Sequence, residues 1–160
     1  MTPRVKRHLI KFHEVDRAQR LQDVYQVGMK DSQINISYVN STEHCVGWNY
    51  HTKQTEYWFV VKGALKVGLV KPDVHINEKK NKSVDPGKVV QSAGVEFEYL
   101  SDKNLQSLEI PPYVYHGYRA LIPGTILMYY ITEKYEDVSK YDDERVPIGY
   151  FGENWDTPNK

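Results

Sequence analysis

Two separated stretches of the chain carry the polar side chains best suited to chemistry. The first starts at Gly47 and reads GWNYHTKQTEYWFVVKG, and the second starts at Ile110 and reads IPPYVYHG. Successive strand residues point to opposite faces of a sheet, so Asn49 and His51 share a face if the first stretch is extended. We expect a closed β structure to bring four polar residues of the two stretches into one cavity: Asn49, His51, Glu56 and His116.

These residues suit two kinds of site. A neutral imidazole near pH 7 can act as a general base. Two imidazoles and a carboxylate also form a sound ligand set for Fe, Mn, Ni or Zn, so His51, Glu56 and His116 are the alternative metal ligands. Plainer interpretations also remain open: a histidine hydrogen-bonded in the wall for His116, surface positions for His51 and Glu56, and a structural hydrogen bond for Asn49.

Composition narrows the classes of function. The 160-residue chain is 40% hydrophobic and 26% charged, as expected for one globular domain. Its 21 Lys and Arg balance 21 Asp and Glu, which gives no overall charge for binding nucleic acid or an anionic membrane. The single cysteine, Cys45, cannot form an intrachain disulfide, which favours a reducing compartment such as the cytoplasm. No apolar run is long enough for a signal peptide or a membrane span.

Apolar and alternating runs separated by turn signals predict an all-β fold. The strands follow one another at intervals near ten residues, which is typical of a sandwich or barrel. They are expected at residues 33–39, 45–51, 56–61, 64–70, 88–91, 94–100, 104–110, 113–121 and 125–132.

The remaining segments are expected to flank this barrel. We expect one domain, 1–160, with an N-terminal arm at 1–32, the barrel at 33–132 and a short helical or irregular C-terminal appendage at 133–160. Two choices stay open from the residues alone. Residues 14–26 fit a short helix or a strand with a turn at Asp16 and Arg17, and residues 136–144 fit a short helix or a loop. Residues 72–87 are predicted to form a surface loop.

The two stretches resemble the motifs of the cupin superfamily. They read G-W-N-x-H-x4-E-x6-G and P-x-Y-x-x-H, beside the cupin patterns H-x-H-x(3,4)-E-x6-G and P-x-G-x-x-H. Asn49 replaces the first histidine, and Tyr113 replaces the glycine. The segments IPPYVYHGYRAL, ILMYYITEKY and DERVPI resemble dTDP-4-dehydrorhamnose 3,5-epimerases and related sugar-nucleotide cupins. The resemblance covers about residues 33–150 and implies a double-stranded β-helix, the cupin jelly roll.

The resemblance also implies roles for single residues. The base of this family is a histidine, and its position holds Asn49, whose amide cannot take up a proton. Its acid is a tyrosine that matches Tyr135, and its second histidine matches His116. Glu56 stands where a lysine would stabilise the enolate, and Val46 stands where an arginine is usual. His51, two residues along the same strand, is therefore the substitute base. Its carboxylate partner stays open among Asp142, Asp143 and Glu153.

From these observations we expect a sugar-nucleotide epimerase or isomerase that removes a proton next to the ketone of a 4-keto-6-deoxy nucleotide sugar, in deoxysugar or surface-polysaccharide synthesis. The alternatives are a metal-dependent cupin acting on a small molecule and a non-catalytic sugar-binding cupin. The epimerase interpretation requires no cofactor, and the family resemblance implies a homodimer. The expected catalytic residues are His51, His116 and Tyr135, and the expected substrate-binding residues are Asn49, Glu56, Tyr57, Tyr129 and Arg119.

Overall fold

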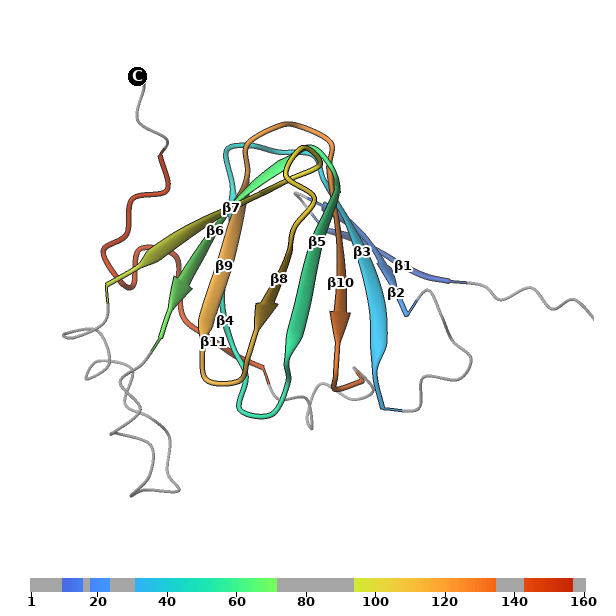
Figure 1. Ribbon diagram of the computed structural model, residues 1–160, viewed down its shortest axis with the longest axis horizontal. Coiled ribbons are helices and arrows are strands. Elements are labelled where there is room, and N and C mark those ends of the chain that lie inside the picture. The colour runs from blue at the N-terminus through green and yellow to red at the C-terminus, as the bar shows by residue number, and fades with distance from the viewer. Residues whose placement is uncertain (1–9, 16–17, 24–30, 72–93, 135–142, 157–160) are drawn as a thin grey trace, which may run out of the picture.

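The chain folds into two antiparallel sheets that face each other (Figure 1). The computed structural model describes residues 10–15, 18–23, 31–71, 94–134 and 143–156. Within these residues the regular elements are all strands, and no helix there is long and apolar enough to cross a membrane. The strands are β1 (Lys11–Val15), β2 (Ala18–Gln22), β3 (Gln33–Val39), β4 (Cys45–Tyr50), β5 (Glu56–Lys62), β6 (Ala64–Val70), β7 (Glu96–Ser101), β8 (Ser107–Ile110), β9 (Tyr115–Ala120), β10 (Thr125–Ile131) and β11 (Glu144–Arg145).

Strands that are distant in the chain alternate within each sheet. One sheet has the order β1-β2-β3-β10-β5-β8, and the other has the order β11-β4-β9-β6-β7. All the strand pairs are antiparallel, including β3 with β10 and β4 with β9. This arrangement confirms the expected all-β double-stranded β-helix.

An apolar core fills one part of the space between the sheets. Val60 on β5, Leu65 and Val67 on β6, and Leu127 on β10 are each at most 1% exposed. Fully burying a side chain of this size contributes about 1.5–3 kcal/mol relative to leaving it exposed. This core holds the two sheets together beside the cavity described below.

Strand β3 buries its polar half and turns its apolar half outward. Gln33, Asn35 and Ser37 are 1–5% exposed, whereas Ile34 and Ile36 are only half-buried. The alternation of β3 therefore matches the predicted strand, but the side that faces the interior is the hydrophilic one. Buried polar groups need hydrogen-bond partners, so this face indicates a polar cavity inside the fold.

The segments outside the predicted barrel belong to the sheets. Strand β1 pairs with β2, and β2 pairs with β3, so the N-terminal segment extends the six-stranded sheet. A helix across residues 14–26 is therefore wrong for the described part of that range. The predicted turn at 16–17, the loop at 72–87, the strand at 88–91 and most of the predicted helix or loop at 136–144 lie outside the described residues.

The C-terminal segment covers the outer face of the five-stranded sheet. Strand β11 pairs with β4, and the backbones of Trp48 and Val146 exchange two hydrogen bonds of 2.9 and 3.1 Å. Trp155 packs on Trp48 with ring centroids 5.3 Å apart, and a single Glu153 oxygen accepts from both indole N–H groups at 2.9 and 3.0 Å. The segment forms a second buried cluster behind the wall that carries Asn49 and His51.

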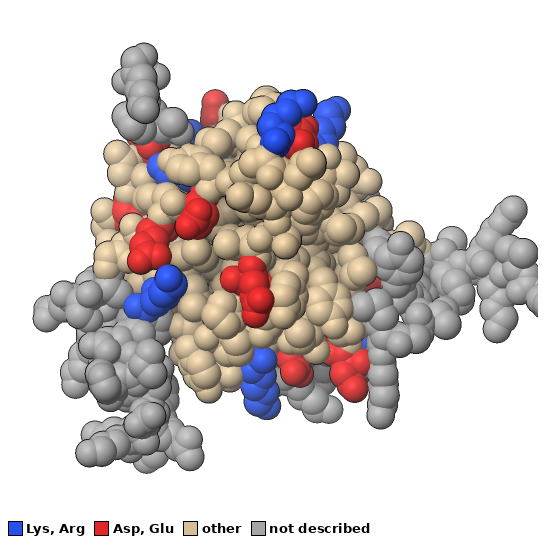
Figure 2. All heavy atoms as spheres, viewed as in Figure 1, with Lys and Arg blue, Asp and Glu red and all other residues tan. Residues whose placement is uncertain are grey.

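Charged side chains are interspersed on the face of the molecule seen in Figure 2. Lysine and arginine side chains occur there singly or beside acidic ones, among a larger uncharged area. The described side chains on this face therefore form no continuous basic surface of the kind that binds nucleic acid.

The second cluster provides a test of how the C-terminal segment is held. A Cβ at Gly68 would lie 2.5 Å from the Trp48 ring and 2.8 Å from the Trp155 ring, so Gly68→Ala must displace an indole. We expect this substitution to lower the free energy of unfolding by about 1–3 kcal/mol, as overpacking does elsewhere. Gly94→Ala is the matched control, because a Cβ at Gly94 meets nothing within 4 Å. Equal urea midpoints for the two variants would contradict this packing.

Candidate functional site

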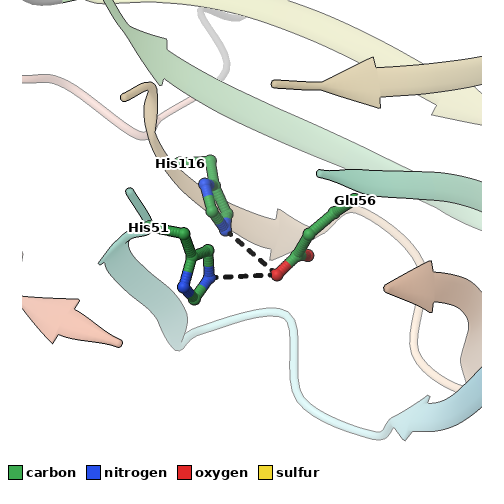
Figure 3. A group of neighbouring side chains, drawn as sticks. All are labelled: His51, Glu56 and His116. Carbon is green, nitrogen blue, oxygen red and sulfur yellow. Dashed lines mark ion pairs between the residues drawn. The ribbon is translucent and has the colours of Figure 1, made fainter. Parts of the chain in front are cut away.

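His51, Glu56 and His116 meet inside the protein (Figure 3). His51 follows β4, Glu56 begins β5, and His116 lies on β9. Glu56 Oε1 is 3.1 Å from His51 Nε2 and 3.7 Å from His116 Nε2. The three side chains are at most 8% exposed, so the two separated stretches converge on one buried cluster.

Two close backbone approaches place the histidines side by side, at the end of β4 and on its neighbouring strand β9. Gly47 has φ +134°, and a Cβ there would lie 2.7 Å from the Gly117 Cα. This contact brings β4 against β9, and Asn49 becomes the register partner of His116. The His51 carbonyl accepts a 2.7 Å hydrogen bond from the Tyr113 N–H, which fixes the end of the strand on which His51 stands.

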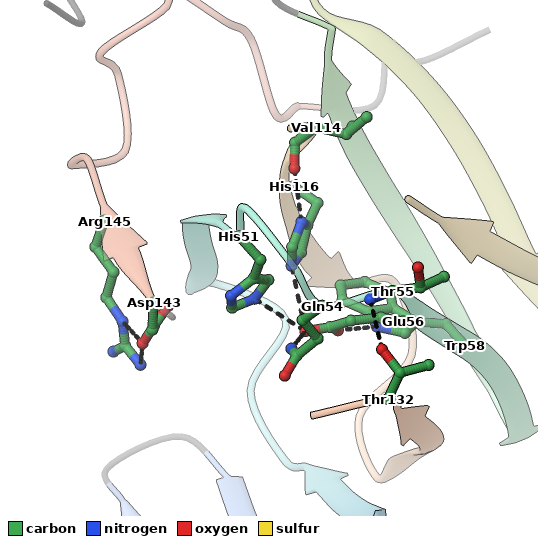
Figure 4. A network of polar contacts seen from close by, with 10 residues as sticks. All are labelled: His51, Gln54, Thr55, Glu56, Trp58, Val114, His116, Thr132, Asp143 and Arg145. Atoms are coloured by element: carbon green, nitrogen blue, oxygen red, sulfur yellow. Dashed lines mark hydrogen bonds and ion pairs between the residues drawn. The ribbon is translucent and has the colours of Figure 1, made fainter. Parts of the chain in front are cut away.

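Neighbouring donors hold the Glu56 carboxylate in place (Figure 4). Gln54 Nε2 donates to Oε1 at 2.6 Å, and Trp58 Nε1 donates to Oε2 at 2.5 Å. Burial by itself would raise the pKa of Glu56, but His116 and His51 outweigh it and hold the pKa well below its ordinary value of 4.5. Glu56 is therefore an anion at neutral pH and a poor proton acceptor.

His116 presents one ring nitrogen to this carboxylate. Its Nδ1 donates to the Val114 carbonyl at 3.0 Å, because a carbonyl can only accept. Its Nε2 is buried and has no hydrogen-bond partner in the described part of the chain, since the 3.7 Å to Glu56 is too long for one. The Val114 contact thus fixes the ring so that Nε2 faces Glu56 and His51.

His51 and Glu56 of this cluster line a cavity of about 310 Å³ between the sheets. This volume is near the lower end of small-molecule sites and matches a monosaccharide ring better than a whole nucleotide sugar. Besides these two residues, the wall includes Trp58, Tyr118, Leu127 and Ile131 together with a set of polar residues. These polar residues are Arg20, Gln22, Gln33, Asn35, Ser37, Asn49, Tyr129, Asp143 and Arg145.

Two buried phenols add proton donors to the cavity. Burial raises the pKa of Tyr118, and it raises the pKa of Tyr129 to about 12, although Arg20 acts in the opposite direction on both. Both hydroxyls interact with Ser37, whose register partner across the sheet is Arg20. At neutral pH both phenols are protonated and can donate hydrogen bonds.

The predicted site residues separate into those in the cavity and those elsewhere. Asn49 and Tyr129 line it with His51 and Glu56, whereas His116 contacts Glu56 but is not a lining residue. Tyr57 does not, because it alternates with Glu56 and Trp58; it is 38% exposed on the outer face of the sheet and contacts Tyr130. Arg119 alternates with Tyr118 and binds the Thr42 carbonyl and the Asp156 carboxylate instead. Tyr135 lies outside the described residues.

Several cavity residues escape the sequence motifs. Arg20, Ser37 and Tyr118 line the cavity but belong to neither sequence motif. Only Ser37 could have been suspected from the sequence, because it lies on the polar side of the alternating strand β3. The sequence left the carboxylate partner of the base open among Asp142, Asp143 and Glu153. The observed partner of His51 is Glu56, while Glu153 holds the indoles behind the wall.

Comparison with known proteins found a curated relative in sequence and several solved structures of similar fold. No family model matches the chain. The spore coat polysaccharide biosynthesis protein SpsL of Bacillus subtilis (strain 168) is 29% identical over 115 residues, which are 69% of this chain and 66%, just under two thirds, of that protein.

Solved structures share the fold at low sequence identity. The dTDP sugar isomerase of Desulfovibrio desulfuricans G20 has a TM-score of 0.58 at 18% identity, over 92% of this chain and 87% of its own. The dTDP-4-dehydrorhamnose 3,5-epimerase of Bacillus anthracis, with TDP and PPi bound, has a TM-score of 0.54 at 20% identity, over 86% and 84%.

The capsular polysaccharide assembling protein CapF of Staphylococcus aureus has a TM-score of 0.64 at 14% identity. The match covers 86% of this chain and 32% of CapF, so this chain corresponds to about a third of that protein. The chain has a double-stranded β-helix, the fold that it shares with the dTDP-4-dehydrorhamnose 3,5-epimerase and the dTDP sugar isomerase.

Proposed function

We propose that the chain is a sugar-nucleotide isomerase of the epimerase type, which moves a proton next to the ketone of a 4-keto-6-deoxy nucleotide sugar in deoxysugar or surface-polysaccharide synthesis. The observation that carries the proposal is the 3.1 Å contact between His51 Nε2 and Glu56 Oε1 in a sugar-sized cavity. The names of the dTDP-4-dehydrorhamnose 3,5-epimerase and the dTDP sugar isomerase support this class of substrate, and the name of SpsL supports the polysaccharide context.

His51 is the proposed base, and Glu56 orients it. With Nε2–H donating to Glu56, Nδ1 is the ring nitrogen that takes the proton from the sugar carbon. The buried carboxylate then stabilises the imidazolium that forms. Glu56 does not itself take the proton, because its pKa is held far below neutrality. A histidine and carboxylate pair of this kind is a common way to position a base.

Tyrosine hydroxyls complete the proposed reaction. Tyr118 and Tyr129 are protonated donors in the cavity wall and can stabilise the developing enolate oxygen. Tyr135 is the acid that the family resemblance implies for returning the proton from the other side. We also propose that the enzyme acts as a cytoplasmic homodimer, in keeping with the same resemblance.

A specific observation favours a second candidate, a divalent-metal cupin. The ligand atoms of His51, Glu56 and His116 all lie within 4.8 Å of one another, and the buried His116 Nε2 has no hydrogen-bond partner in the described residues. Two imidazole nitrogens and a carboxylate oxygen fit such an ion, and the Val114 carbonyl holds the His116 ring in a ligating orientation. A metal bound there would supply Lewis-acid polarisation of a substrate carbonyl or of water.

Loss of the base should abolish proton exchange. We expect the wild-type protein to catalyse solvent deuterium incorporation next to the ketone of a dTDP-4-keto-6-deoxy sugar, measured by NMR, and His51→Asn to slow it by about 10²–10⁴-fold. The matched control is His44→Asn, because His44 is exposed and hydrogen-bonds only locally, with Ser41. Absence of exchange in the wild type with any 4-keto nucleotide sugar would exclude this chemistry.

The charge of Glu56 should appear in the pH dependence of stability. Its pKa is lower in the folded protein than in the unfolded chain, so its ionised form stabilises the fold above about pH 4.5, and this contribution is lost as the pH falls through the folded-state pKa. We expect Glu56→Gln to cost about 2–3 kcal/mol at pH 7, as loss of hydrogen bonds to a charged group does, with a difference from wild type that shrinks below pH 4.5.

Denaturant unfolding at several pH values measures that difference. Glu96→Gln is the control, because Glu96 forms an exposed pair with Lys71 and should change stability by less than about 1 kcal/mol. A difference for Glu56→Gln that grows as the pH falls below 4.5 would contradict the assigned charge.

The metal candidate predicts one bound ion per chain. Equilibrium dialysis against Zn²⁺, Mn²⁺, Fe²⁺ or Ni²⁺, followed by elemental analysis, should give one equivalent for the wild type and for His44→Asn. His116→Gln should reduce the bound amount by at least tenfold, because it removes one of three ligands. Failure of all four metals to bind the wild type would exclude this candidate.

A further inference from the structure

The cavity contains a guanidinium that the proposed chemistry does not use. Arg20 on β2 lines the same cavity as His51 and Glu56. Its Nε is buried and has no hydrogen-bond partner within the described ranges. A buried cationic donor without a partner is unfavourable, so an unmatched guanidinium nitrogen in a ligand-sized cavity indicates a group that the ligand supplies.

The protein surrounds Arg20 with hydroxyl groups. Tyr118 forms a hydrogen bond with it, and Tyr129 lies close enough to interact with its charge. Ser37 is its register partner on β3 and interacts with both phenols. These groups orient the guanidinium without neutralising it, because both phenols are protonated at neutral pH.

Other side chains bind both carboxylates of the cavity wall, Asp143 through one of its two oxygens. Glu56 accepts from Gln54 and Trp58 and contacts His51. Asp143 binds Arg145 through Oδ2, at 2.8 Å to Nε and 2.7 Å to Nη2, and its charge also acts on Arg20.

The remaining Asp143 oxygen, Oδ1, is itself buried without a partner in the described residues, so it is not hydrogen-bonded to Arg20 Nε. Among the described residues, therefore, no carboxylate of the cavity wall is hydrogen-bonded to Arg20 Nε. An anionic group on a ligand would complete its hydrogen bonding.

We propose that Arg20 binds an anionic group, a carboxylate or a phosphate, carried by the sugar that enters the cavity. A guanidinium presents parallel N–H groups that match both kinds of oxygen pair. The inference rests on the proposed function for the premise that a sugar fills the cavity. It keeps the 4-keto nucleotide sugar of that proposal but replaces the 6-deoxy sugar by one that carries a negative charge of its own, as at C6, apart from the nucleotide diphosphate, because the cavity is too small to enclose both.

The Arg20 subsite also orients the ligand. The Tyr118 ring, which binds Arg20, lies 5.4 Å from the Trp58 ring, and Trp58 donates to Glu56. These two aromatic side chains, Tyr118 from the five-stranded sheet and Trp58 from the six-stranded sheet, thus link Arg20 to Glu56 through consecutive contacts. A sugar with its anionic group on Arg20 turns its other side toward His51.

Calorimetric titration of the full chain tests this subsite. The probes are glucuronate, glucose 6-phosphate, glucose and inorganic phosphate, and the proteins are wild type, Arg20→Met, Arg20→Lys and the control Lys71→Met. Lys71 is an exposed residue paired with Glu96, so its substitution removes the same charge far from the cavity wall.

We expect the wild type to bind one of the two anionic sugars about 10- to 100-fold more tightly than glucose. Arg20→Met should remove that preference without weakening glucose binding, Arg20→Lys should retain part of it, and Lys71→Met should retain all of it. A preference for glucuronate identifies a carboxylate ligand, and a preference for glucose 6-phosphate identifies a phosphate ligand.

The failing outcomes are distinct. Equal binding of glucose and both anionic sugars by the wild type, or an unchanged preference in Arg20→Met that still unfolds at the wild-type midpoint, overturns the inference and leaves the proposed function standing. Binding of inorganic phosphate alone shows an adventitious ion only and also overturns it. Failure of every sugar to bind overturns the sugar-binding premise and the inference together.

Discussion

The cavity is organised by a carboxylate that stays ionised although it is buried. Glu56 is 6% exposed, and isolating such a charge from water is costly unless donors surround it. Gln54, Trp58 and His51 supply these contacts, and His116 adds a ring nitrogen at 3.7 Å. Because these side chains come from β5, from β9 and from the loop between β4 and β5, the charge can be accommodated only when both sheets are assembled.

The wall that holds this cluster is packed from both sides. The inward residues of β4 and β9 face the cavity, while Trp48, Tyr50 and Tyr115 face a second cluster under the C-terminal segment. Tyr50 and Tyr115 stack with centroids 4.4 Å apart on that outer side. Packing on the outer face restricts the strand backbones, which makes the positions of the inward imidazoles well defined.

The sequence predicted the parts of this site that depend on local pattern. The spacing of Glu56 from Gly63 and the residues that precede His116 indicated the fold and its two paired stretches. Both patterns are local, because each depends on one short strand and the turn beside it. The face on which a residue lies was harder to predict. Tyr57 and Arg119 lie one position away from inward residues, and a shift of one residue reverses the face.

Long-range contributions could not be predicted from the chain alone. Arg20 and Asp143 reach the cavity from short, polar segments before and after the predicted barrel, and neither segment has a strong period-two pattern. The polar half of β3 lies inward because a cavity occupies the space where apolar packing would otherwise be expected. A hydrophobicity pattern records which half of a strand is polar, but it does not state which half is buried when the interior is hollow.

The five-stranded sheet also divides the three indole rings of the chain into two optical environments. Trp58 lines the cavity and donates to an anion, whereas Trp48 and Trp155 lie in mutual contact under the C-terminal segment. Fluorescence quenching by a bound ligand should therefore arise mainly from Trp58. The near-ultraviolet circular dichroism of Trp48 and Trp155 should report separately on the packing of the second cluster. Ligand binding and this packing can therefore be followed in one unlabelled sample.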